Sequence, residues 1–177
     1  YTISNVEEYN NVFTHNANST EFIGHVRFIN NIDFNDDEKA IQTRANFTLG
    51  ASSTKTSVEG NGMTIGGIYL DVGEAIVEKI GLFAEIDNAY VKNLNLEFAT
   101  PKTDGQFSTT TSTYSGGLAG SINNTAIINI KLSGVNTTLT GSNFVGGVAG
   151  LISGNSLVYG IETNLNVKAS ATESYLY

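Results

Sequence analysis

The sequence predicts an all-β fold, a parallel β-solenoid preceded by a short N-terminal capping helix. Three observations support this fold. Apolar stretches after residue 20 are short, rich in Val, Ile and Leu, and separated by Gly or Asn. A pattern of glycines and apolar residues recurs in the second half of the chain. Only the first segment has helical periodicity. With 177 residues, 40% of them hydrophobic, the chain fits one domain or one elongated repeat tract with its own core.

The helix is expected near the N-terminus. Its apolar side chains recur at the spacing of one helical face: Val6, Tyr9, Val12 and Phe13. Ser4 or Asn5 can cap this helix, and acidic residues follow in the first turn, where the helix dipole is positive. We therefore expect a helix over about residues 5–15. We interpret residues 1–35 as an N-terminal cap, helix plus first strands, and residues 36–177 as the parallel β-helix.

A threefold repeat is the main evidence for the solenoid. The copies lie at about residues 81–98, 117–134 and 147–163, and their lead glycines are 36 and then 30 residues apart. The repeat-defining residues are Gly81, Ile86, Gly117, Gly120, Ile122, Gly147, Gly150 and Ile152. A period near 30 fits one solenoid coil, which buries its apolar row only by stacking on its neighbours. We expect the isoleucines to form one internal row and the glycines to lie where a Cβ would not fit. The equivalent Asn93 and Asn129 predict a short amide ladder.

The Gly-Leu-Ala-Gly sequence at residues 117–120 resembles the GLUG repeat, a family named for its Gly-Leu-any-Gly motif. Residues 147–150 are a close variant with Val in the second position, whereas residues 81–84 depart because Ala84 replaces the last Gly. Upstream, residues 6–9 are similar to the family's opening helix and residues 31–34 to its Asp-Ile-Asp-Leu strand. Residues 58–65 are similar to its Phe-Asp-Gly-Asn-Gly-His-Thr-Ile element. Together these segments cover most of residues 3–160.

The resemblance implies a right-handed parallel β-helix on a secreted or surface-attached bacterial protein. Such repeats occur in large adhesins and in the N-terminal region of IgA1-type zinc metalloproteases. The family carries no catalytic residues in its repeats, so the resemblance transfers none to this chain. It also implies an extracellular or cell-surface location, which the composition alone does not establish.

The charge balance excludes several classes of partner. The formal net charge is −8 and the pI about 4.6, so we expect no binding to nucleic acid. Residues 1–104 hold 15 acids and 7 bases, and residues 105–177 hold two of each.

The absence of Cys excludes disulfides, thiolate zinc sites and a cysteine nucleophile. No apolar run approaches 18 residues, so we expect no transmembrane segment. The chain begins with Tyr1 rather than Met, which we interpret as processing or excision from a longer protein.

Few residues suit catalysis or metal binding. His15 and His25 are the two histidines, and without a His-Glu-x-x-His motif they predict no zincin site. The densest acidic cluster comprises Asp33, Asp36, Asp37 and Glu38. We interpret it as a turn with solvated charges, and a Ca²⁺ site is the alternative. We expect no other cofactor.

A hydroxyl-rich segment with aromatic ends, residues 107–114, interrupts the repeat. Because it interrupts the repeat, we predict that it bulges from one coil as a loop. Insertions in solenoids often carry binding residues. Its candidate ligand contacts, for a glycan or a protein, are Phe107, Thr109, Thr111 and Tyr114. A passive loop is the alternative.

Together with these observations, the resemblance to the GLUG repeat implies a non-catalytic segment of a bacterial secreted or surface protein, acting in virulence. It would serve as an adhesin stalk or as a binding surface for a host protein or glycan. One alternative is a substrate-binding accessory region of a secreted metalloprotease, whose partners would be other regions of its own parent chain. The other is a carbohydrate-active β-helix enzyme, which needs carboxylates converging on one sheet face. No paired spacing of acids indicates one, and only Arg27 and Arg44 could serve as guanidinium partners.

Overall fold

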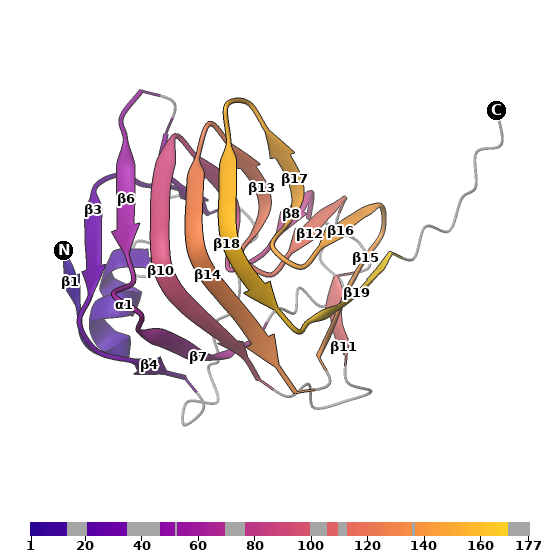
Figure 1. The fold of residues 1–177 in the computed structure, drawn as a ribbon, viewed down its shortest axis with the longest axis horizontal. Helices are drawn as coiled ribbons and strands as arrows, with labels where there is room; N and C mark the ends of the chain where they lie inside the picture. The colour runs from indigo at the N-terminus through magenta and orange to yellow at the C-terminus, as the bar shows by residue number, and fades with distance from the viewer. Residues whose placement is uncertain are drawn as a thin grey trace, which may run out of the picture.

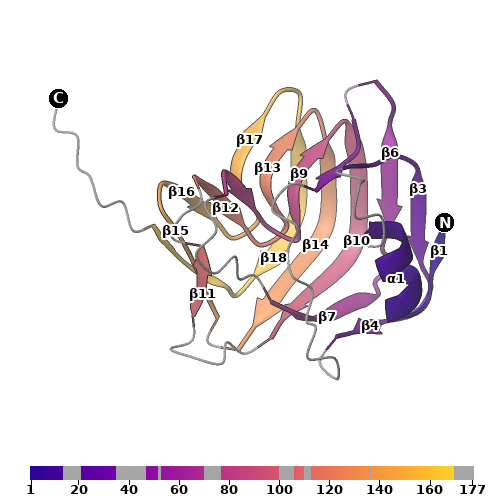
Figure 2. The same cartoon turned by 180° about the vertical axis from the view of Figure 1, so that it is seen from behind.

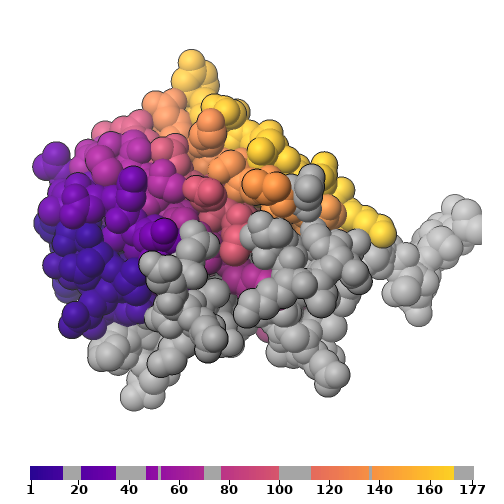
Figure 3. Space-filling model, turned by 90° about the horizontal axis from the view of Figure 1, so that it is seen from below, coloured from indigo at the N-terminus to yellow at the C-terminus, as the bar shows by residue number. Residues whose placement is uncertain are grey.

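A computed structural model describes residues 1–13, 21–34, 47–51, 53–69, 77–99, 106–109, 113–135 and 137–169, with backbone alone at 106–109. The chain winds into a parallel β-solenoid with a short helix at its N-terminal end (Figure 1). The coils follow one another along the molecule, from the first residues at one end to the last described residues at the other (Figure 3). The predicted fold class is therefore confirmed.

The longest sheet occupies one side of the solenoid (Figure 1). Its strands in spatial order are β1 (Thr2–Ile3), β3 (His25–Phe28), β6 (Thr56–Glu59), β10 (Ala89–Phe98), β14 (Ala126–Gly134) and β18 (Leu157–Thr163), joined by β4 (Ile32–Asp33) and β7 (Thr64–Ile68). All of its described pairs are parallel, because equivalent strands of successive coils run in the same direction. The register aligns one inward apolar row through five strands: Val26, Val58, Val91, Ile127 and Val158.

Three smaller sheets form the other sides of the solenoid. One lies behind the long sheet (Figure 2) and contains β2 (Glu21–Phe22), β5 (Thr48–Leu49), β9 (Phe83–Asp87), β13 (Ala119–Asn123) and β17 (Ala149–Ser153). The second contains β8 (Lys79–Ile80), β12 (Tyr114–Gly116) and β16 (Phe144–Gly146), and the third contains β11 (Gln106–Thr109), β15 (Thr138–Gly141) and β19 (Asn166–Ala169). The turns β8–β11, β12–β15 and β16–β19 thus each supply one strand to every sheet.

Helix α1 (Val6–Phe13) begins with a reciprocal cap, which explains why the helix starts there. The side-chain oxygen of Asn5 accepts a hydrogen bond from the Glu8 N–H at 2.9 Å. The Glu8 carboxylate turns back and accepts bonds from the Ser4 backbone N–H at 2.6 Å and the Ser4 hydroxyl at 2.8 Å. These two bonds hold the pKa of the Glu8 carboxyl below its usual value.

Helix α1 closes the N-terminal end of the solenoid with aromatic side chains. Tyr9 and Phe13 are 1% and 3% exposed, on the face that the sequence predicted. The Phe13 ring centre lies 5.5 Å from those of Phe22 and Phe83, which belong to different coils. Burial also raises the pKa of the Tyr9 phenol. Residues 1–35 therefore contain two kinds of element: the covering helix, and strands β3 and β4, which already pair with the next coil.

The C-terminal end is open by comparison. All four sheets end on a strand of the last turn, namely β16, β17, β18 and β19. Ile152 in β17 continues the row of Ile86 and Ile122, which are fully buried, but Ile152 itself is 48% exposed. We call the apolar residues that continue internal rows or aromatic stacks into this last turn the C-terminal end face: Phe144, Ile152, Val158, Ile161 and Val167.

Candidate binding surfaces

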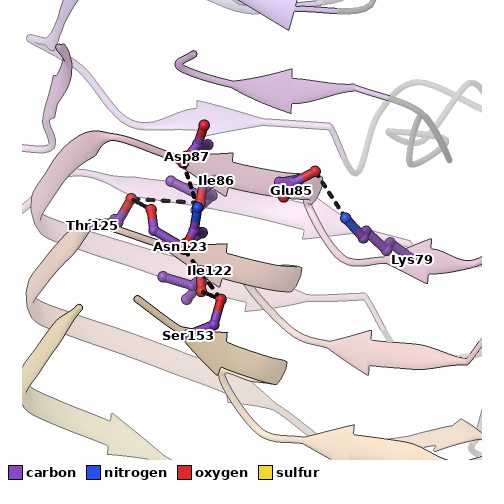
Figure 4. Close-up of polar contacts among 8 residues, drawn as sticks. All are labelled: Lys79, Glu85, Ile86, Asp87, Ile122, Asn123, Thr125 and Ser153. Carbon is purple, nitrogen blue, oxygen red and sulfur yellow. Dashed lines mark hydrogen bonds and ion pairs between the residues drawn. The ribbon is translucent and has the colours of Figure 1, made fainter. Parts of the chain in front are cut away.

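The repeat isoleucines lie in one row, as predicted, but only Ile86 and Ile122 are internal, since Ile152 in the last turn is 48% exposed. Ile122 is the Cα partner of Ile86 on one side and of Ile152 on the other. Figure 4 shows Ile86 and Ile122 in neighbouring strands, with their side chains in the same column. The row explains why the apolar position five residues after each lead glycine recurs. It is a stabilising column rather than a ligand site, since each full burial of such a side chain contributes about 1.5–3 kcal/mol.

The repeat glycines mark close approaches between strands, with one exception. A Cβ added at Gly81, Gly117, Gly120 or Gly150 would lie 2.5–2.6 Å from a backbone atom of a neighbouring segment. Such a contact cannot form without a backbone shift, which explains the need for glycine there. Gly147, in the last turn, differs: the nearest atom to an added Cβ is a methyl carbon of Thr163 at 3.4 Å.

Asparagines form two columns of left-handed corners. Asn93 and Asn129, with φ values of 54° and 53°, bend β10 and β14, and Gly160 with φ 67° bends β18. The second column contains Asn88, Asn124 and Gly154, with φ values of 48°, 48° and 63°. Asn tolerates this conformation better than most residues do. The predicted ladder is present: the Asn129 amide donates to the Asn93 side-chain oxygen at 3.1 Å, and the Asn93 amide donates to Glu59 at 3.0 Å.

A polar network joins three coils beside the isoleucine row (Figure 4). The Asn123 amide donates to the Asp87 carboxylate at 2.9 Å, and the Ser153 hydroxyl donates to the Asn123 side-chain oxygen at 3.3 Å. The buried Thr125 hydroxyl donates to the Asn123 carbonyl at 2.8 Å and accepts a bond from the Ala89 N–H at 3.1 Å. The sequence analysis missed this network, because its members come from three coils and share no motif.

The outer face of the long sheet is charged in its N-terminal half. Arg27, Glu59 and Lys92 are Cα partners in one row across β3, β6 and β10. Burial of the Glu59 carboxyl acts to raise its pKa, but hydrogen bonds from Lys92, Asn93 and the Asn61 N–H outweigh burial and lower it. The hydrogen bond to Glu59 in turn raises the pKa of Lys92. The ion pairs of the described residues are Lys92–Glu59 at 2.8 Å, Lys79–Glu85 at 2.9 Å and Lys131–Glu162 at 2.8 Å.

The part of this face that precedes the Asn93 and Asn129 corners becomes apolar toward the C-terminal end, whereas beyond those corners Lys131 and Glu162 keep it charged. Lys92 pairs with Ile128 and Ile128 with Tyr159, while the adjacent row runs Tyr90, Ala126, Leu157. We call these five apolar residues the lateral patch: Tyr90, Ala126, Ile128, Leu157 and Tyr159. Tyr90 is 39%, Leu157 53% and Tyr159 67% exposed. The Lys92 ammonium lies 5.5 Å from the centre of the Tyr90 ring, at the edge of the patch.

Sequence reasoning missed the lateral patch. The outward direction of Tyr90, Leu157 and Tyr159 follows from their alternation with the inward Val91 and Val158. That alternation was visible in the sequence. The strand pairing that brings Tyr90 close to the other two was not, because Tyr90 precedes Leu157 by 67 positions and Tyr159 by 69.

The hydroxyl-rich segment is not a bulging loop where the structure describes it. Phe107 and Thr109 lie in strand β11, which pairs in parallel with β15, so the loop prediction is wrong for these positions. Thr and Phe have high strand propensity, so this segment forms a strand of the solenoid. Tyr114 begins β12, and its ring stacks on Phe144 with centres 5.2 Å apart. Thr111 lies outside the described residues, and ligand contact by this segment stays a prediction.

The remaining titratable candidates occupy separate places. The His25 ring nitrogen Nδ1 shares a hydrogen bond with the Ser57 hydroxyl at 2.7 Å, on the exposed face of β3 and β6. Asp33 ends β4, whereas His15 and residues 36–38 lie outside the described residues, so the alternative of a Ca²⁺ site at Asp33, Asp36 and Asp37 stays a prediction. Within the part of the chain that the structure describes, no group of three or more His, Cys, Asp or Glu side chains could hold a metal ion.

Helices of the described residues are too short or too polar to cross a membrane. Comparisons of this chain with protein-family models, with curated proteins and with solved structures gave no match.

Proposed function

We propose that this chain is a non-catalytic β-solenoid segment of a bacterial secreted or surface protein, and that it presents the lateral patch to a host protein or glycan. The resemblance of residues 117–120 and 147–150 to the GLUG repeat supports the bacterial surface setting. The solenoid supplies the stalk, and the outer face of its longest sheet supplies the contact. Catalysis would then belong to other parts of a parent protein, if it has any.

The observation that carries this proposal is the change of character along one outer face. In its N-terminal half the Glu59 carboxylate binds the Lys92 ammonium and the Asn93 amide. The lateral patch instead exposes Tyr90 on β10, and Leu157 and Tyr159 on β18 two strands away. Contiguous exposed apolar surface in a folded protein marks an interaction site more often than a neutral one. Tyrosine suits such a site because its ring is apolar and its hydroxyl can hydrogen-bond.

The geometry of the patch fits an extended ligand. Tyr90 and Tyr159 lie two strands and two residues apart, which sheet spacings convert to about 12 Å between their Cα atoms. Asn129 follows Ile128 directly and places a side-chain amide at the border of the patch. A sugar chain or a polypeptide strand lying along the face would contact both rings and this amide.

The test is a binding screen of the 177-residue chain against arrayed glycans and immobilised host surface proteins. The double variant Tyr90→Ser with Tyr159→Ser should lose at least about tenfold in affinity for any ligand found, because aromatic anchors dominate binding energies. The matched control is Tyr1→Ser, since Tyr1 is 74% exposed but lies at the N-terminal end. If the double variant binds as the unchanged chain does, the lateral patch is not the contact surface.

A further inference from the structure

The outer face of the long sheet changes the sign of its charge at the asparagine corners in β10 and β14. Among the described residues, the strand segments before these corners carry two bases and one acid: Arg27, Lys92 and Glu59. The segments beyond the corners carry one base and three acids: Lys131, Asp33, Glu97 and Glu162. The formal charge is therefore +1 before the corners, with His25 neutral, and −2 beyond them. The lateral patch lies in the positive part, although the whole chain has a charge of −8.

Of the two bases in the positive part, Arg27 is the one without a partner. Glu59 lies between Arg27 and Lys92 in the row, and its carboxylate binds the Lys92 ammonium at 2.8 Å and the Asn93 amide at 3.0 Å. Arg27 is exposed, and no hydrogen bond or ion pair of the described residues holds its guanidinium. A guanidinium binds an oxyanion such as a carboxylate through two parallel hydrogen bonds. Because the neighbouring acid is already engaged, Arg27 is available to an external anion.

Arg27 and the lateral patch belong to one outward row. The row crosses the five strands β3, β6, β10, β14 and β18 (Figure 1), from Arg27 at one end through Lys92 and Ile128 to Tyr159 at the other. Neighbouring strands are about 4.8 Å apart, so the Cα atoms of Arg27 and Tyr159 are separated by about 19 Å. One step between strands is close to the length of one sugar ring in a linear oligosaccharide. A short sugar chain along the solenoid axis would therefore reach both ends of the row.

The backbone of this face is already paired, which favours a glycan over an extended peptide. Strands β6, β10 and β14 each have a parallel partner on both sides. An extended peptide gains much of its affinity by adding a strand to a free sheet edge. A sugar chain binds through side chains instead, with its C–H faces on aromatic rings and its oxygen atoms on amide and guanidinium donors. The face offers these groups in Tyr90, Tyr159, Asn129 and Arg27.

We propose that the lateral patch and Arg27 together bind an acidic glycan, a sugar chain that carries carboxylate or sulfate groups. The tyrosine rings contact the faces of the sugars, and the Arg27 guanidinium binds one of the anionic groups. The acidic part of the face beyond the corners repels the same ligand and so keeps it along the row. This inference rests on the proposed function, because it names the ligand class of the same surface.

Affinities for matched oligosaccharides test the charge of the ligand. Isothermal titration of the 177-residue chain would use cellohexaose, which is neutral, its sulfated form, and a hyaluronan hexasaccharide, which carries carboxylates. At least one acidic probe should bind at least about tenfold more tightly than cellohexaose, because charge complementarity supplies the difference. High salt should remove most of that difference, since it screens exposed charges. Comparison of the two acidic probes shows whether sulfate or carboxylate is preferred.

Arg27→Gln tests the residue that distinguishes acidic from neutral sugars. This variant should weaken the acidic probe at least about tenfold and leave the affinity for cellohexaose unchanged, because it removes the guanidinium alone. The matched control is Lys168→Gln, which removes an exposed base, without an ion pair among the described residues, from β19 in another sheet. The control changes the net charge equally, so it should leave the affinity within about twofold. Circular dichroism checks that both variants retain the β fold.

Several outcomes would overturn the inference. They are equal affinity for cellohexaose and the acidic probes, no binding of either acidic probe, and equal effects of Arg27→Gln and Lys168→Gln. Tighter binding of a hexaglutamate peptide than of the acidic sugars would also overturn it, because the surface would then suit an acidic peptide. The proposed function fails on a different result, namely a ligand whose binding the Tyr90→Ser with Tyr159→Ser variant leaves unchanged. A neutral glycan whose binding that variant abolishes would overturn the acidic preference and retain the contact surface.

Discussion

The two ends of the solenoid differ in how far their apolar residues are covered. At the N-terminal end a helix and several phenylalanine rings cover the first coil, and Phe13 is 3% exposed. At the C-terminal end the apolar rows run to the surface, and Phe144 is 53% exposed although it stacks on Tyr114. The difference teaches that a residue in a repeat is buried by its neighbours on both sides. Residue type alone does not decide burial here.

Replacement of one phenylalanine at each end gives the largest contrast. Phe13→Ala should lower the free energy of unfolding by about 3–5 kcal/mol, because it leaves a cavity among rings from three coils. Phe144→Ala should cost about 1 kcal/mol, mainly the stacking on Tyr114. Urea unfolding followed by circular dichroism, at a concentration where the chain is monomeric, measures both. Equal losses would show that the C-terminal end is covered in solution.

Alanine substitutions at two equivalent glycines should give a smaller difference in unfolding free energy between the last coil and the coil before it. Gly117→Ala should cost about 1–3 kcal/mol, because the new Cβ would lie 2.6 Å from the Gly147 carbonyl oxygen. Gly147→Ala, one coil later, should stay within about 0.5 kcal/mol, because the atoms nearest to its Cβ belong to the Thr163 side chain and begin at 3.4 Å, an ordinary contact distance. Thermal unfolding of both variants provides the measurement. A costly Gly147→Ala would indicate a further layer on the last coil.

The asparagine ladder gives a third, still smaller contrast. Asn129→Ala loses the bond to Asn93 and puts an alanine at φ 53°, for a cost of about 2 kcal/mol. Asn129→Gly loses the bond but keeps the conformation, as Gly160 does in the last coil, so about 1 kcal/mol is expected. Urea midpoints distinguish the two. The left-handed corner has no energetic role if both substitutions cost the same.

Acidification should lower the stability of the fold less than these substitutions do, and the loss should lie in the N-terminal half. The pKa values of the Glu8 and Glu59 carboxyls are lowered in the folded chain, so each contributes stability above its unfolded pKa of about 4.3. That contribution is lost as the pH falls through the lower folded value. The urea midpoint should therefore drop on acidification, and less so in Glu8→Gln with Glu59→Gln. Hydrogen exchange should locate the loss near Tyr9 rather than near Ile161.

Local and periodic features could be predicted from the sequence. The helical face of Tyr9 and Phe13, the isoleucine row and the Asn93–Asn129 bond all follow from residues at fixed spacing. The helix begins at Val6, because Asn5 rather than Ser4 supplies the cap. These features depend on contacts within one element or between equivalent positions of a repeat. Both kinds of contact can be inferred from the spacing of residue types along the sequence.

Features that depend on strand pairing between unlike positions could not be predicted. The hydroxyl-rich segment around Phe107 was predicted as a loop because it breaks the repeat, but β15 offers it a partner strand. The lateral patch joins Tyr90 to Tyr159 through strand pairing that no motif records. Candidate ligand residues chosen by composition therefore differed from those that the fold exposes.

The parallel pairing of the coils has a consequence for mechanical load. The strands run across the long axis of the solenoid, so the hydrogen bonds between coils point along it. A force that pulls the two ends apart acts along those bonds and breaks them one coil at a time, rather than shearing a whole sheet at once. Among the described strands, the turn β16–β19 pairs on one side only, so we expect it to separate before the inner turns. A tether built this way would lengthen in steps under tension and shorten again when the tension is released.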